Sequence, residues 1–143
     1  PAAPTRLTVL LAEDNPINAL LARKLLEKAG VEVIAVTDGE AALGAVLAAQ
    51  DGSGPPLDAA LLDVRMPGMD GKTVVERIRT AERAQDLPRL PVAAVTANAF
   101  SEDRSACLAA GFDAFVPKPI DRKAIAAFLA GLRPANAAPE RAA

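Results

Sequence analysis

A chain of 143 residues, of which 51% are hydrophobic and 24% charged, has the composition of a single globular domain. A formal net charge of -2 and the lack of Trp and Tyr provide neither a basic face nor a stacking platform, so we expect no binding to nucleic acid. The absence of histidine excludes a Ser-His-Asp triad and a His-containing zinc site. The single cysteine, Cys107, and the lack of a long apolar run predict a cytoplasmic domain without direct membrane contact.

The two ends of the chain differ in composition from its middle. Residues 1–5 and 133–143 are rich in Pro and Ala without apolar periodicity, which is typical of a linker and of a disordered tail. The region between them alternates short apolar runs with helical patterns. We therefore predict one folded domain over residues 6–132.

The first expected elements are a strand and a helix. Residues 7–12 form a continuous aliphatic run, as a buried strand does. Asn15 then has the position of a helix N-cap, with Pro16 at the first helical residue, where its missing N–H costs nothing. Apolar residues follow at helical spacing, at Ile17, Leu21 and Leu25. Gly30 has the position of a C-cap, so the helix is expected to end there.

Further strands and helices alternate along the rest of the chain. Aliphatic and β-branched runs predict strands at residues 31–36, 57–63, 92–96 and 112–116. Helices are expected at residues 37–50, opened by a capping-box pair Thr37 and Glu40, and at 70–84, 101–110 and 121–132. This alternation predicts an α/β fold, a doubly wound (βα)5 domain with five parallel strands in the flavodoxin-like order 2-1-3-4-5.

Some side chains of these helices can be assigned to the core or to the surface. In the third helix, Val74 and Ile78 are expected to face inward. The arginines of that helix alternate with Glu76 and Glu82, which is typical of a solvated face, and they are Arg77, Arg79 and Arg83. Cys107 falls among small residues and is expected to be a buried small hydrophobe.

Polar residues collect at the carboxyl ends of the predicted strands, where ligands bind in such sheets. Glu13 and Asp14 follow the first strand, and Asp63 closes the third. Thr96 closes the fourth strand, and Lys118 follows the fifth. Three neighbouring carboxylates need a cation, and oxygen ligands suit Mg²⁺. A carboxylate can also act as a nucleophile, so the set indicates phosphoryl transfer onto an aspartate.

Four motifs carry a resemblance to a known family. Residues 61–71 (LLDVRMPGMDG) resemble the phosphoacceptor motif of response-regulator receiver domains of two-component systems. The pairs Glu13-Asp14, Thr96-Ala97 and Lys118-Pro119 resemble the other signatures of that family, and the resemblance covers residues 6–132. Residues 12–18 (AEDNPIN) and 95–111 are most similar to the C-terminal receivers of bacterial hybrid sensor histidine kinases.

The resemblance implies a role for each residue of the site. Asp63 is expected to be the phosphoacceptor, with Lys118 binding a phosphoryl oxygen. Mg²⁺ or Mn²⁺ is expected to be held by the side chains of Glu13, Asp14 and Asp63 and by the backbone carbonyl of Arg65. Thr96 and Phe115 are implied as the switch residues, and the Lys118–Pro119 bond is implied to be cis.

The implied reaction is transfer of a phosphoryl group from a phosphohistidine, followed by slow hydrolysis. Because these 143 residues contain no histidine, the donor lies outside them, in a histidine kinase domain or a histidine phosphotransfer protein. The domain would promote its own phosphorylation and dephosphorylation without being a turnover enzyme, and a hybrid parent chain would be a histidine kinase. The responding face is expected at residues 101–132.

Three alternatives remain open from the sequence. The chain can be a pseudo-receiver that regulates an attached kinase by contact alone, although the intact set of site residues weighs against this. It can also be a stand-alone single-domain response regulator. A small phosphatase of similar topology is the third alternative. Against one class of phosphatase, the segment Asp63-Val64-Arg65 lacks the second aspartate that haloacid-dehalogenase-type enzymes place two residues on.

Overall fold

The computed structural model describes residues 7–66, 68–96, 101–118 and 120–132, with the side chains of residues 101–103 left aside. The linker and tail expected at residues 1–5 and 133–143, and the cis bond expected at Pro119, lie outside the described residues. None of the described helices is long and apolar enough to cross a bilayer.

The strands form one parallel sheet in the order β2-β1-β3-β4-β5, which confirms the predicted topology. The strands are β1 (Thr8–Ala12), β2 (Glu32–Val36), β3 (Ala59–Asp63), β4 (Val92–Thr96) and β5 (Ala114–Pro117). The central strand β3 is buried at every residue, because helices cover both faces of the sheet there. The edge strand β2 is only partly covered.

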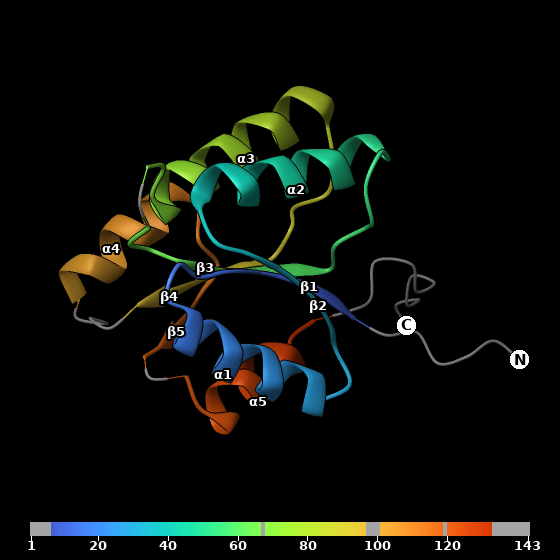
Figure 1. The fold of residues 1–143 in the computed structure, drawn as a ribbon. Helices are drawn as coiled ribbons and strands as arrows, with labels where there is room; N and C mark the ends of the chain where they lie inside the picture. The colour runs from blue at the N-terminus through green and yellow to red at the C-terminus, as the bar shows by residue number, and fades with distance from the viewer. Residues whose placement is uncertain (1–6, 67, 97–100, 119, 133–143) are drawn as a thin grey trace, which may run out of the picture.

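The helices are α1 (Pro16–Lys28), α2 (Gly39–Asp51), α3 (Gly71–Gln85), α4 (Ser101–Ala110) and α5 (Arg122–Ala130). In Figure 1, α2 and α3 lie side by side on one face of the sheet, and α1 and α5 lie on the other. Two apolar clusters fill these layers. One joins Leu10, Leu62 and Ile78 on the α2–α3 side, and the other joins Leu11 and Ile125 on the α1–α5 side.

Capping residues define where several helices begin. The Asn15 side chain accepts hydrogen bonds from the N–H groups of Ile17 and Asn18, at 2.9 and 3.1 Å, which confirms the predicted cap. The predicted capping box at Thr37 is wrong. Asp38 caps α2 instead by accepting the Ala41 N–H at 2.8 Å, and the helix begins at Gly39.

The apolar spacing of α1 predicts the helix but not its buried face. Ala22 and Leu26 are fully buried, whereas the side chain of Ile17 is 76% exposed. Leu20 and Leu21 are exposed as well. The end of α1 nearest the candidate site therefore presents large apolar side chains to solvent.

Arg79 corrects the expected solvated face of α3, because only 4% of this residue is exposed. Its guanidinium donates to the carbonyl oxygens of Gly111 and Leu90 and to the carboxylates of Glu82 and Asp113. A buried charge is tolerated only when it is paired and hydrogen-bonded in this way. The network ties α3 to the segments that precede β4 and β5, at the edge of the sheet opposite the candidate site. Val74, Ile78 and Cys107 are buried as predicted.

Candidate functional site

The register of the sheet brings the predicted residues to one edge. Ala12 pairs with Leu62, Asp63 with Val95, and Thr96 with Pro117, so β1, β3, β4 and β5 end at the same level. The residues that end or follow these strands are Glu13, Asp63, Thr96 and Lys118. Backbone hydrogen bonds continue the ladder past the strands, from the Glu13 N–H to Val36 and from the Lys118 N–H to Thr96.

Three carboxylates meet at this edge. Glu13, Asp14 and Asp63 each offer an oxygen atom, and these atoms lie within 4.8 Å of one another. Glu13 and Asp63 are each only 2% exposed, whereas Asp14 faces solvent. One side of the cluster is therefore held by buried groups, and the other opens to solution.

One ammonium group faces the buried pair. The Lys118 Nζ lies 2.9 Å from Asp63 Oδ2 and 3.8 Å from Glu13 Oε1. The other Asp63 oxygen, Oδ1, accepts the Arg65 N–H at 3.0 Å. Both oxygens of Asp63 are thus oriented, one by a side chain and one by the backbone of the loop that follows β3.

The pKa of Glu13 is raised, chiefly by its burial. Burial, and then the neighbouring Asp63 carboxylate, raise its pKa from 4.5 to about 7, against the lowering effects of the Asn15 N–H and of Lys118. A single ammonium does not neutralise three carboxylates. The three carboxylates are hard oxygen donors and together carry excess negative charge. Such a set of donors fits a hard divalent cation.

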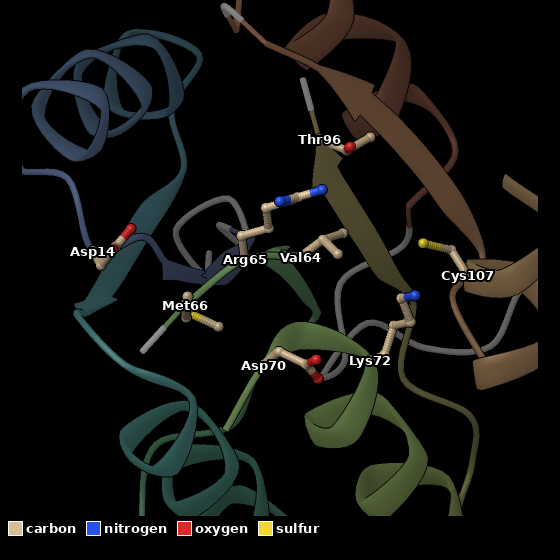
Figure 2. A pocket seen from close by; sticks show the side chains of 8 residues that line it. All are labelled: Asp14, Val64, Arg65, Met66, Asp70, Lys72, Thr96 and Cys107. Carbon is tan, nitrogen blue, oxygen red and sulfur yellow. The ribbon is translucent and has the colours of Figure 1, made fainter. Parts of the chain in front are cut away.

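A cleft of about 630 Å³ opens beside the cluster. Figure 2 shows Asp14 at one side of it and Thr96 and Cys107 at the other, with the Arg65 guanidinium reaching toward the end of β4. The remaining lining residues are Val64, Met66, Asp70 and Lys72. Met66 and Lys72 were not predicted from the sequence as cleft residues, although both follow Asp63 closely, in the loop after β3 and in the first turn of α3.

Phe115 lies apart from the cleft. It is half-buried on β5 opposite Ala94, and it packs against the apolar cluster on the α2–α3 side of the sheet. The guanidinium carbon of Arg104 on α4 lies 4.7 Å from the centre of its ring, which is a cation–π distance. The structure therefore brings Glu13, Asp14, Asp63, Thr96 and Lys118 to one edge of the sheet, whereas Phe115 lies within β5 and packs against the apolar cluster.

Comparison with known proteins agrees with the fold. The family model described as the response regulator receiver domain matches residues 9–130, and the chain belongs to this family. It is a phosphoacceptor receiver domain of the two-component type.

Several curated relatives of the chain are sensor kinases. Sensor protein GacS of Pseudomonas syringae pv. syringae is 40% identical over 136 residues, which cover 93% of this chain but 14% of that protein. Hybrid signal transduction histidine kinase L of Dictyostelium discoideum is 43% identical over 117 residues, which are 82% of this chain and 7% of that protein. The chain thus spans a small part of the length of both relatives.

A solved structure adds a metal. The receiver domain of sensor histidine kinase PA1611 from Pseudomonas aeruginosa PAO1 has a magnesium ion coordinated in its active site cleft. It is 35% identical to this chain with a TM-score of 0.71, and the match covers 87% of this chain and 94% of that one.

The raised pKa of Glu13 predicts a pH dependence in the metal-free protein. Between pH 4.5 and about 7 the folded state holds more protons than the unfolded state, so the free energy of unfolding falls as pH rises through this range. We expect Glu13→Gln to remove this component of the slope. Urea unfolding in the presence of a chelator from pH 5 to pH 8 measures it. Glu32→Gln, at an exposed carboxyl, is the control; an unchanged slope in Glu13→Gln contradicts the assignment.

Proposed function

We propose that Asp63 accepts a phosphoryl group from a phosphohistidine that lies outside these 143 residues. The observation that carries the proposal is the position of Asp63, buried among two other carboxylates and paired with Lys118 at 2.9 Å. A buried carboxylate that is held by an ammonium on one oxygen and by a backbone N–H on the other is an oriented nucleophile.

The cation would be Mg²⁺, or Mn²⁺ in its place. Glu13, Asp14 and Asp63 would hold it with their side chains, and Arg65 would hold it with its backbone carbonyl. When bound, the cation supplies positive charge that neutralises the carboxylates and the transferring phosphoryl group. The magnesium ion of the PA1611 receiver supports this assignment.

The transfer itself is a displacement at phosphorus. An oxygen of the Asp63 carboxylate forms the new P–O bond while the P–N bond to the donor histidine breaks, and the electron pair of that bond returns to the imidazole nitrogen. When the Asp63 carboxylate becomes an acyl phosphate, Lys118 loses its negatively charged partner and pairs with the phosphoryl oxygens instead. Its ammonium therefore stays paired throughout the transfer. Thr96, at the rim of the same cleft, would donate its hydroxyl hydrogen to another phosphoryl oxygen.

The signal would leave the site through Thr96 and Phe115. A phosphoryl group biases a two-state element only through contacts that differ between the states. Phe115 has no hydroxyl, so its two positions would differ in burial and in its contact with Arg104 on α4. The responding face would be that of α4, β5 and α5.

The domain that carries the phosphohistidine would contact α1. Leu21 and Asn18 of α1 lie around a small hollow with Glu13 and Lys118, so this helix borders the acceptor site. Ile17 and Leu20 extend the border as exposed apolar residues, 76% and 55% exposed. We propose that a histidine kinase domain or a histidine phosphotransfer protein in the cytoplasm covers this surface during transfer.

Labelling with acetyl phosphate and Mg²⁺ tests the acceptor. We expect intact-protein mass spectrometry to show a gain of one phosphoryl group that Asp63→Asn abolishes. Asp86→Asn is the matched control, because Asp86 is exposed in a left-handed conformation that Asn tolerates. Amide signals of β5 are expected to shift with labelling. No mass gain in the wild type supports the contact-only regulator, and labelling that persists in Asp63→Asn excludes Asp63.

Substitutions on α1 test the donor contact. We expect the pair Ile17→Ser and Leu20→Ser to slow transfer from a phosphorylated kinase core that labels the wild type, by about tenfold or more, because two apolar side chains lose their burial against the donor. Labelling by acetyl phosphate stays unchanged, since that donor is too small to contact the exposed side chains of Ile17 and Leu20. Leu108→Ser, at an exposed leucine of α4, is the control. Equal transfer rates in all variants contradict the contact.

A further inference from the structure

The loop between β3 and α3 carries two groups of the proposed site. The Asp63 carboxylate lies at its start, and the Arg65 N–H donates to that carboxylate at 3.0 Å. The Gly71 N–H donates to the Val64 carbonyl oxygen at 3.0 Å and closes the loop onto the end of β3. The position of the Arg65 carbonyl therefore depends on how the described residues of this loop, 64–66 and 68–70, are held.

Two glycines hold this loop by close approach of backbone to backbone. A Cβ atom at Gly71 would lie 2.6 Å from the Asp63 carbonyl oxygen and 3.0 Å from the Val64 Cα. A Cβ atom at Gly39 would overlap the Met69 carbonyl oxygen and would lie 2.8 Å from the Met69 carbonyl carbon. Because these neighbours are backbone atoms, no side-chain rotation can make room for a methyl group.

Gly39 is the more informative of the two, because it belongs to a different part of the chain. It is the first residue of α2, it is buried, and its φ is not in the left-handed region. Its backbone conformation is therefore open to any residue. Glycine is favoured there because the Met69 carbonyl occupies the space where a Cβ atom would lie. The first turn of α2 thus abuts the loop that follows the acceptor.

We propose that Gly39 is a positioning residue for the metal site. By admitting the Met69 carbonyl against α2, it sets the place of the β3–α3 loop and with it the Arg65 carbonyl and N–H. This inference rests on the proposed function, in which the Arg65 carbonyl is a ligand of the cation. A methyl group at Gly39 would push the loop away from α2, and the ligand geometry that Mg²⁺ requires would be lost.

Gly39→Ala and Gly44→Ala are a matched pair for the test. Both substitutions fall in α2 and both favour the helix, because Ala is a better helix former than Gly. A Cβ atom at Gly44 meets nothing within 4 Å, so only Gly39→Ala crowds the loop. The readouts are Mn²⁺ affinity by electron paramagnetic resonance, the Mg²⁺ dependence of labelling by acetyl phosphate, and the thermal stability of the metal-free protein.

We expect Gly39→Ala to weaken metal affinity by about 10- to 100-fold, the range seen when residues that orient ligands are changed. The Mg²⁺ concentration for half-maximal labelling should rise by the same factor, whereas Gly44→Ala behaves as the wild type. A folded Gly39→Ala with wild-type affinity overturns the proposal. If the wild type neither binds metal nor is labelled, the proposed function itself fails.

A measurement on the wild type decides the matter if Gly39→Ala does not fold. In a titration of the domain with Mg²⁺, the amide signals of Gly39 and Met69 should shift with the same midpoint as that of Arg65. The Gly44 signal, five residues further along α2, should stay in place. A Gly39 signal that does not respond while Arg65 does overturns the proposal.

Discussion

The ion pair between Lys118 and Asp63, at 2.9 Å, is the interaction on which the site depends. Without it, two carboxylates that are each 2% exposed would lie together with no other ammonium of the described residues within 4 Å. Even with it three carboxylates share one close ammonium, and burial, helped by the neighbouring Asp63 carboxylate, raises the pKa of Glu13 to about 7. The residual negative charge attracts a cation. Once the cation neutralises the carboxylates, the Lys118 ammonium can pair with an incoming phosphoryl group. The excess of negative charge at this edge of the sheet is thus part of how the proposed site would bind its cation.

The rest of the fold keeps these charges in place. Parallel pairing sets the ends of four strands at one level, and the two apolar clusters fix the helices on either face. At the opposite edge, Arg79 ties α3 to the segments before β4 and β5. The acceptor loop is then confined between the end of β3 and the first turn of α2.

Residue patterns predict the strand order and the members of the site, because a parallel sheet places every strand end at one edge. They do not predict contacts between distant segments. Arg79 was expected to be solvated, since its partner Asp113 lies 34 residues away. The sequence around Gly39 does not predict its close contact with the Met69 backbone. The exposure of the Ile17 side chain could not be predicted either, because the packing of α1 on the sheet decides which face of the helix is buried.

The most direct test of the account replaces the ammonium. Lys118→Gln removes the one cationic side chain that, among the described residues, lies within 4 Å of Glu13 and Asp63, so we predict tighter binding of Mn²⁺ together with labelling by acetyl phosphate that is slower by about 100-fold. Both quantities are measured on the same preparation, with Lys24→Gln as an exposed control. Unchanged labelling, or metal binding that weakens with the loss of the charge, would contradict the central role of this ion pair.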